Sequence, residues 1–200
     1  MNLRTDQALI AEWIKPSSRV LDLGCGDGTL MAHLQQQQEV KGYGLEIDEE
    51  NIVQCIDKGV DVIQTDLDKG LSEFKKDTFD YVIMTQTLQA IYYPDKLLKE
   101  MTRVGREAIV TFPNMGHWKN RLQLALAGHM PKSKTLPYEW YNTPNIHLCT
   151  LTDFENLCAA NNIEILDRAT VDHEHQSSFG MNLFPNLLGE IAIYRFRQND

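Results

Sequence analysis

The sequence lacks the short motifs that mark several enzyme and metal-binding classes. Its four cysteines include no pair at C-x-x-C spacing, so neither a zinc ribbon nor a thioredoxin-type motif is predicted. It also contains no G-x-x-x-x-G-K-[ST], no H-E-x-x-H and no G-x-S-x-G. These absences count against a phosphate-loop ATPase, a zincin protease and a standard serine esterase. The cysteines are expected to be free thiols, packed mostly as small hydrophobic side chains.

Positive charge is also scarce, with 19 Lys and Arg against 28 Asp and Glu and a net charge of −9. Such a balance disfavours nucleic acid as the main partner, because phosphate needs a basic surface. No apolar run approaches the roughly 20 residues of a spanning helix, and the first residues lack a signal-peptide core. We therefore expect a cytoplasmic chain with no membrane partner.

Short apolar strands alternate with helices through the first 110 residues, a rhythm typical of parallel strands joined by right-handed crossovers. Helices are predicted over Arg4–Ile14, Thr29–Gln37, Glu49–Lys58 and Asp95–Val104. Strands are predicted over Arg19–Leu23, Gly42–Ile47, Val60–Gln64, Phe79–Met84 and Glu107–Phe112. The pattern predicts an α/β fold with a doubly wound, Rossmann-like sheet and helices on both faces.

The rhythm stops after Phe112. Residues 113–150 hold four of the seven prolines and two of the three tryptophans. A helix is then predicted over Thr152–Ala160, followed by strands over Glu164–Thr170 and Glu190–Phe196 with a loop at 172–187 between them. We interpret residues 1–200 as a single domain with an insertion at about 113–150.

A glycine-rich turn, within VLDLGCGDGTL, is the strongest signal of a binding site. Gly24, Gly26 and Gly28 permit positive φ angles and let a ligand approach the backbone at the carboxyl end of a strand. The spacing differs from the dinucleotide pattern G-x-G-x-x-G. Asp22 would repel a pyrophosphate but suits a ligand with an ammonium or sulfonium charge. The alternative for the turn taken alone is a purely structural role as a tight, glycine-rich turn.

Two further carboxylates follow the next two predicted strands. Glu46 lies 18 residues after Gly28, in the position from which a carboxylate binds two ribose hydroxyls. Asp48 is expected to cap the following helix. Asp66 could accept a hydrogen bond from the adenine amino group, with Leu67 against the ring. Each carboxylate alone fits a solvated strand end or turn, but three of them around one glycine loop favour a nucleoside ligand.

The motifs VLDLGCGDGTL, GLEID, TDL and FDYVIM together resemble the class I S-adenosylmethionine-dependent methyltransferases over about residues 19–112. The resemblance implies a seven-stranded sheet whose last strand is antiparallel. It also implies S-adenosyl-L-methionine as cofactor, or S-adenosyl-L-homocysteine as product. The glycine loop is assigned to methionine, Glu46 to ribose and Asp66 to adenine. The expected cofactor-binding residues are Asp22, Gly24, Cys25, Gly26, Gly28, Glu46, Ile47, Asp66, Leu67 and Gln86.

A longer resemblance covers nearly the whole chain. TLQAIYYPDKLLKEMTRVGREAIVTFPNMGHWKNRLQLALAGHMP, LPYEWYNTPNIHLCTLTDFE and LFPNLLGEIAIY are similar to the MetW family of methionine-biosynthesis proteins. That resemblance implies a link to homoserine O-acyltransferase, which becomes the expected protein partner.

The sequence offers no clear catalytic base. The fourth predicted strand ends in MTQT, without the N-P-P-[YF] motif of amide methylation, and Gln86 can contribute hydrogen bonds only. His147 and Tyr138 are weak candidates for a base, and a structural role is the alternative for both. No metal site is predicted, because His173 and His175 lack a third ligand nearby.

The insertion is locally basic. Residues 111–150 carry four basic side chains against Glu139 alone, whereas the rest of the chain has 15 basic and 27 acidic residues, a net of −12. The four are Lys119, Arg121, Lys132 and Lys134. With its aromatic residues, the insertion fits a protein-docking surface or an acceptor lid. The ordinary alternative is an amphipathic helix over Trp118–Ala127 that covers the sheet.

Two functions therefore stay open. The chain is a cofactor-binding partner or regulatory subunit in methionine biosynthesis, or it is an active methyltransferase on an unknown small-molecule acceptor. The missing base and the insertion favour the first. A nicotinamide-dependent oxidoreductase is disfavoured by the glycine spacing.

Overall fold

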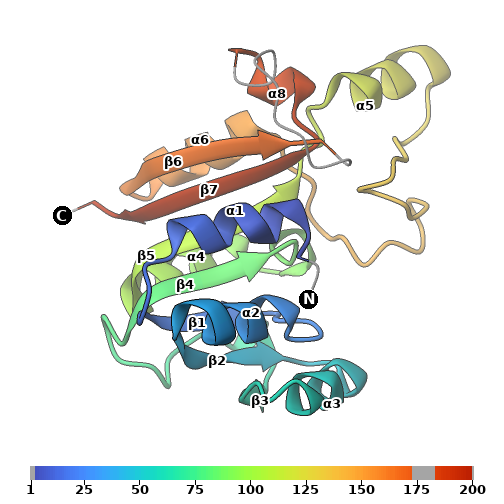
Figure 1. The fold of residues 1–200 in the computed structure, drawn as a ribbon. Coiled ribbons are helices and arrows are strands. Elements are labelled where there is room, and N and C mark those ends of the chain that lie inside the picture. The colour runs from blue at the N-terminus through green and yellow to red at the C-terminus, as the bar shows by residue number, and fades with distance from the viewer. Residues whose placement is uncertain (1–2, 173–182, 200) are drawn as a thin grey trace.

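A single seven-stranded sheet forms the centre of the molecule (Figure 1). The computed structural model describes residues 3–172 and 183–199. The strands are β1 (Arg19–Leu23), β2 (Lys41–Glu46), β3 (Val62–Gln64), β4 (Phe79–Thr85), β5 (Gly105–Pro113), β6 (Ile163–Val171) and β7 (Ile191–Gln198). Their order is β3-β2-β1-β4-β5-β7-β6, and only β7 pairs antiparallel with its neighbours β5 and β6. The expected sheet, including its antiparallel last strand, is confirmed.

Helices cover both faces of this sheet. One face packs against α1 (Thr5–Trp13), α2 (Thr29–Gln38) and α3 (Glu49–Asp57), and the other against α4 (Pro94–Val104) and α6 (Leu151–Ala160). Successive side chains of a strand point to opposite faces of the sheet, so each strand contributes to the hydrophobic core on either face. In β4, Tyr81 and Ile83 pack on the face of α1, α2 and α3, whereas Val82 and Met84 pack on the face of α4 and α6. Burial on both faces explains why these strands read as continuous apolar runs.

An aromatic cluster joins the antiparallel edge of the sheet to α6. The ring of Phe154 lies 4.6 Å from that of Tyr194, 5.1 Å from that of Phe112 and 5.9 Å from that of Phe196, measured between centroids. The Tyr194 hydroxyl donates a 2.8 Å hydrogen bond to Glu155, which satisfies its polar group at the rim of the core.

Side-chain caps begin two of the helices. Asp48 caps α3 as expected, accepting a 3.0 Å hydrogen bond from the backbone N–H of Asn51. Thr150 and Asp153 form a reciprocal capping box at the start of α6. Most helix and strand bounds agree with the sequence-based ones within two residues.

The expected helix over Trp118–Ala127 does form, but the interpretation that it covers the sheet is wrong. Its first part is α5 (Trp118–Leu122), which continues as the π-helical turn η3 (Gln123–Ala127). This element projects away from the sheet (Figure 1), and Leu122, Leu124 and Leu126 are exposed. The two buried cores on the faces of the sheet are formed with the five helices named above, and no residue of Trp118–Ala127 belongs to either core.

Smaller elements were not predicted. The short 3-10 helices η1 (Leu67–Lys69) and η2 (Leu88–Ala90) follow β3 and β4. Helix α8 (Pro185–Leu188) lies within the stretch that we expected to be a loop, and residues 173–182 of that stretch fall outside the described residues. Among the helices of the described part, none has both the length and the apolar character needed to cross a membrane.

Truncation of the aromatic cluster tests its role in holding the edge of the sheet. Phe154→Ala leaves a cavity between β5, β7 and α6, and we expect a loss of about 3–5 kcal/mol in the free energy of unfolding, measured by urea denaturation. Phe184→Ala is the matched control, because Phe184 is 56% exposed, and its effect should be close to zero. Equal effects of the two substitutions would contradict the packing described above.

Candidate functional site

A cavity of about 400 Å³ opens at the carboxyl ends of β1, β2 and β3. Its lining includes five of the residues predicted from the sequence: Gly24, Glu46, Ile47, Asp66 and Leu67. The remaining lining residues are Leu45, Thr65, Asp68, Thr87, Ala90, Ile91 and Tyr92. The topology therefore brings the three predicted strand ends to one place.

The three glycines of the loop have positive φ angles of 66°, 56° and 73°, at Gly24, Gly26 and Gly28. A Cβ at Gly24 would lie 2.7 Å from the Thr87 hydroxyl, and one at Gly28 would lie 2.8 Å from Cys55 Sγ. Packing within the protein thus requires the outer two glycines. A Cβ at Gly26 would meet no heavy atom within 4 Å, so this glycine faces open space that a ligand can enter.

Glu46 fixes this loop. The Gly26 N–H donates a 2.8 Å hydrogen bond to Glu46 Oε2, and the N–H groups of Ile47 and Asp48 donate to Oε1 at 2.9 and 3.0 Å. The side chain is only 7% exposed. A carboxylate can accept about four hydrogen bonds, and these three N–H groups use three of them. While all three contacts persist, the Glu46 carboxylate can therefore accept about one further hydrogen bond from a ligand.

Asp66 organises the opposite wall of the cavity. Its carboxylate caps η1 by accepting a 3.0 Å hydrogen bond from the Asp68 N–H. Asp68 in turn accepts a 2.9 Å bond from the backbone N–H of Tyr92, which draws the segment after η2 to the cavity. His147 is exposed, with Nε2 3.3 Å from the Tyr92 carbonyl oxygen, so it lies beside the cavity and not in its lining.

Asp22 and Cys25 lie beneath the loop. Asp22 is 1% exposed, and its Oδ1 has no hydrogen-bond partner among the described residues. Burial raises the pKa of Asp22 to about 7; Arg4 lowers it and Glu46 raises it further. Burial likewise raises the pKa of the Cys25 thiol, whose Sγ lies 3.7 Å from that of Cys55. All four cysteines are free thiols, as expected.

A second cavity, of about 690 Å³, adjoins the first, because Ala90 lines both. Gln86 and Tyr138 are brought together in its lining, with Lys134 and Asn145. The Gln86 amide is already engaged, since Nε2 donates a 3.2 Å hydrogen bond to Asp6 Oδ2 in α1. The two candidate bases therefore have different surroundings. Tyr138 lines the second cavity, whereas His147 contacts the Tyr92 carbonyl oxygen.

The residues around η2 that line the first cavity were not predicted from the sequence, above all Thr87, Ala90 and Tyr92. The only signal for them was their position after a strand that ends at the same edge of the sheet as the glycine loop. Within residues 3–172 and 183–199, no group of three or more His, Cys, Asp or Glu side chains has a metal-binding arrangement. His173 and His175 lie outside those residues.

Known proteins share this fold. An S-adenosylmethionine-dependent methyltransferase from Mesorhizobium loti superposes with a TM-score of 0.70 and 13% identity, covering 98% of both chains. The [4+2]-cyclase SpnF superposes with a TM-score of 0.67 and 19% identity, covering 96% of this chain and 80% of that one. The fold is therefore the class I methyltransferase-like α/β fold.

The sequence comparisons identify a particular family within that class. The family profile described as "Methionine biosynthesis protein MetW" matches residues 4–196. The "Bifunctional methionine biosynthesis protein MetXA/MetW" of Rhodopirellula baltica is 35% identical over 209 aligned positions, which cover 100% of this chain. The chain belongs to the MetW family, and it spans about a third (34%) of the length of that curated relative.

The buried carboxyl of Asp22 predicts a pH dependence of stability. Its pKa of about 7 in the folded state exceeds the 3.8 of an ordinary aspartate, so the folded state retains a proton that the unfolded state has lost. The free energy of unfolding should therefore fall as pH rises through this interval, by at most about 1.4 kcal/mol per pH unit. Asp22→Asn removes this contribution, so its stability relative to wild type should increase by about 2 kcal/mol from about pH 5 to about pH 8.

Urea denaturation of wild type and Asp22→Asn at both pH values measures that difference directly. Titrations of groups that do not interact with Asp22 cancel in the comparison. A difference independent of pH would show that Asp22 is ionised throughout.

Proposed function

We propose that this protein binds S-adenosyl-L-methionine in the cavity beside the glycine loop and acts in methionine biosynthesis as a partner or regulatory subunit of homoserine O-acyltransferase. The observation that carries the cofactor assignment is the cavity that Gly24, Glu46 and Asp66 line together at the strand ends. Gly26, whose N–H is bound by Glu46, has open space at its Cβ position. When bound, the cofactor supplies a sulfonium-activated methyl group.

The residues present fit that cofactor. Glu46 retains acceptor capacity for ribose, and donation by both hydroxyls would replace at least one of its backbone contacts. Asp66 has one oxygen occupied by the Asp68 N–H, and its carboxylate lines the cavity where an adenine amino group would donate. Leu67 and Ile47 provide apolar surface for the base. The unpartnered Oδ1 of Asp22 favours a ligand that brings a cationic group to the loop.

The exposed surface of the insertion supports a protein partner. Of 19 exposed large hydrophobic side chains among the described residues, ten lie in residues 113–150. Trp140 and Tyr141 are 74% and 70% exposed and form an edge-to-face pair with centroids 5.7 Å apart. Aromatic side chains of this kind commonly anchor interfaces.

The Rhodopirellula baltica relative bears on the identity of the partner. Its name joins MetXA to MetW in one chain, and this protein spans only 34% of its length. We identify the additional component with the acyltransferase expected from the sequence. Two components that are fused in one organism can associate as separate chains in another, and residues 113–150 supply the surface for that contact.

An active methyltransferase is the second candidate. The cavity lined by Gln86 and Tyr138 adjoins the proposed cofactor cavity and offers space for a small acceptor. SpnF, which shares the fold, is a [4+2]-cyclase, so the fold alone does not define the reaction. Methyl transfer from the bound cofactor to a metabolite, measured with the chain alone, would favour this second candidate.

Cofactor affinity tests the first half of the proposal. Glu46→Ala removes the ribose acceptor, and calorimetry with S-adenosyl-L-methionine should show a loss of about 1.5–3 kcal/mol, roughly tenfold to over a hundredfold in affinity. Gly26→Val should abolish binding, because its side chain projects into the space assigned to the cofactor and strains a φ of 56°.

Asp48→Ala is the matched control. This neighbouring carboxylate caps α3 and does not line the cavity, so the variant should lose about 1 kcal/mol of stability and keep its affinity. Normal binding by a folded Gly26→Val variant would remove the loop from the cofactor site.

Association kinetics with the acyltransferase test the second half. Trp140→Ala should speed dissociation and weaken binding by about 2 kcal/mol, roughly thirtyfold, since an aromatic anchor is lost. Lys132→Glu combined with Lys134→Glu should mainly slow association at low salt. Surface plasmon resonance gives both rates.

Tyr93→Ala is the control for an exposed aromatic outside the insertion, at 55% exposure, and should bind like wild type. Because Trp140 is exposed, its truncation should leave the melting temperature unchanged. Wild-type binding by both insertion variants, or no complex at micromolar concentrations, would assign the insertion to an acceptor lid and move the enzyme hypothesis ahead.

A further inference from the structure

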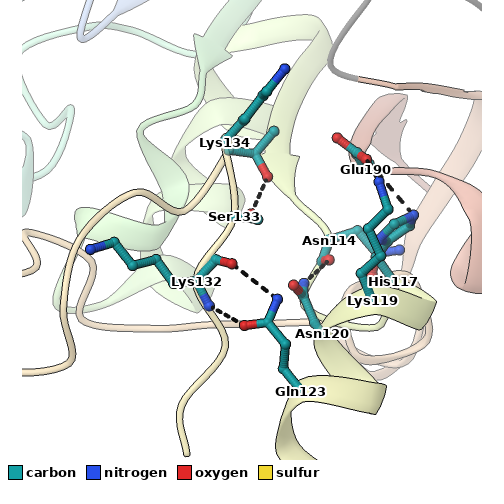
Figure 2. A pocket seen from close by; sticks show the side chains of 10 residues that line it. Asn114, His117, Lys119, Asn120, Gln123, Lys132, Ser133, Lys134 and Glu190 are labelled. Carbon is teal, nitrogen blue, oxygen red and sulfur yellow. Dashed lines mark hydrogen bonds and ion pairs between the residues drawn. The ribbon is translucent and has the colours of Figure 1, made fainter.

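Two cavities that share no lining residue with the proposed cofactor cavity collect cationic side chains, and they differ in whether those cations converge. In the cavity between α5 and residues 132–135, Figure 2 shows the side chains of Lys132 and Lys134 pointing in different directions. Lys119 lies 3.5 Å from Glu190 in the same lining. The cations of this cavity therefore present no common point to a ligand.

The other cavity, of about 450 Å³, lies at the amino ends of β4 and β5, at the opposite end of the sheet from the glycine loop (Figure 1). Of its nine described lining residues, five are Lys or Arg and one, Asp77, is acidic. This concentration of positive charge occurs on a protein whose net charge is −9. The lining residues are Lys76, Asp77, Lys99, Thr102, Arg103, Gly105, Arg106, Arg197 and Gln198.

Backbone and side-chain contacts hold four chain segments around this basic cavity. The Asp77 N–H donates a 3.0 Å hydrogen bond to the Arg103 carbonyl oxygen, which joins the segment before β4 to the last turn of α4. The Thr102 hydroxyl lies 3.2 Å from Gln198 Oε1, which joins the same turn to the end of β7. Strands β5 and β7 pair antiparallel, so the start of β5 lies beside the end of β7. The cationic side chains thus project from a fixed backbone, which lowers the ordering cost of binding.

Two of the lining arginines have close carboxylate partners. Arg103 Nη2 lies 2.7 Å from Glu100, and the same guanidinium also donates to two backbone carbonyl oxygens. Arg197 donates to Glu164 at 2.7 Å through Nε alone. Arg103 is therefore fully used within the protein, whereas the terminal N–H groups of Arg197 can reach a ligand.

The other three lining cations are weakly paired or unpaired. Arg106 approaches Asp80 only to 3.5 Å, and Arg19 already contacts both oxygens of that carboxylate. The ammonium groups of Lys76 and Lys99 make no ion pair within residues 3–172 and 183–199. These three side chains are exposed and are available to an anion.

The balance of charge indicates which anion fits. The lining residues and their ion-pair partners comprise six cationic side chains and four carboxylates, an excess of two positive charges. The cations are Arg19, Lys76, Lys99, Arg103, Arg106 and Arg197, and the carboxylates are Asp77, Asp80, Glu100 and Glu164. A phosphate monoester carries about −1.5 to −2 charge at pH 7 on one group, with three acceptor oxygens for Lys and Arg N–H groups.

We propose that the basic cavity binds a small phosphate monoester, whose phosphate group contacts Lys76, Lys99 and Arg106. Its volume lies within the roughly 300–1,000 Å³ of small-molecule sites. The site goes beyond the proposed function, since it requires neither the acyltransferase nor S-adenosyl-L-methionine, which contains no phosphate.

Calorimetric titration of the full chain with methyl phosphate, without cofactor or partner, tests the proposal. Dimethyl phosphate has a similar shape but one negative charge, so it should bind at least about tenfold more weakly. Succinate carries two charges on separate groups and should also bind more weakly. Lys76→Met should lower the affinity for methyl phosphate about tenfold. Lys75→Met is the matched control, because this exposed neighbour carries the same charge outside the lining, and its loss should be much smaller.

Amide shifts in nuclear magnetic resonance spectra give the location of binding. Methyl phosphate should move the signals of residues 76–77, 105–106 and 197–198 and leave residues 24–28 unchanged. No binding of methyl phosphate, equal binding of dimethyl phosphate, or equal or tighter binding of succinate would each overturn the proposal. Equal losses in Lys75→Met and Lys76→Met, or shifts confined to residues 24–28, would overturn it too. Titration with S-adenosyl-L-methionine is independent of all these outcomes.

Discussion

The carboxylate of Glu46 is the contact on which the rest of the site depends. It accepts hydrogen bonds from the N–H groups of Gly26, Ile47 and Asp48, and so joins the loop after β1 to the end of β2. Without the Glu46 carboxylate, these three backbone N–H groups would lose this hydrogen-bond acceptor at the end of the sheet. The same carboxylate lines the cavity, so one side chain holds the loop and presents an acceptor to a ligand.

The molecule separates a site at the end of a buried strand from an exposed insertion. Strand β1, which leads into the glycine loop, is packed in the core, with Leu21 and Leu23 fully buried. Residues 113–150 instead hold exposed apolar side chains that the five helices on the sheet leave without a core to enter. A surface of this kind is suited to a second protein, whereas the strand-end cavity is suited to a small molecule. This division underlies the proposal of a cofactor site at the strand ends and a partner surface on the insertion.

Much of the fold follows from sequence patterns that local physics controls. Strand β1 begins and ends where the apolar run predicts, and the glycine loop and Asp48 cap occupy their expected positions. Strand β3 starts later than predicted, because the Val60 N–H donates to the Cys55 carbonyl oxygen at the end of α3 and is withdrawn from the sheet. The pattern of apolar residues in Val60–Gln64 contains no information about that competition.

Tertiary arrangement decided the remaining features. The sequence of Trp118–Ala127 predicts a helix, but whether the sheet or another protein covers it depends on how many helices already occupy the sheet. Burial leaves one oxygen of Asp22 and one of Asn120 without a hydrogen-bond partner among the described residues, and no sequence motif reports this. Five of the ten predicted cofactor-binding residues do not line the strand-end cavity, and their roles in binding stay predictions: Asp22, Cys25, Gly26, Gly28 and Gln86.

Amide hydrogen exchange at Gly26 tests most directly whether Glu46 organises a cofactor-binding loop. The account predicts that this amide is protected in the free protein, through its 2.8 Å bond to Glu46, and is further protected when S-adenosyl-L-methionine is added. Rapid exchange at Gly26 in the free protein, unchanged by S-adenosyl-L-methionine, would contradict both the contact and the site.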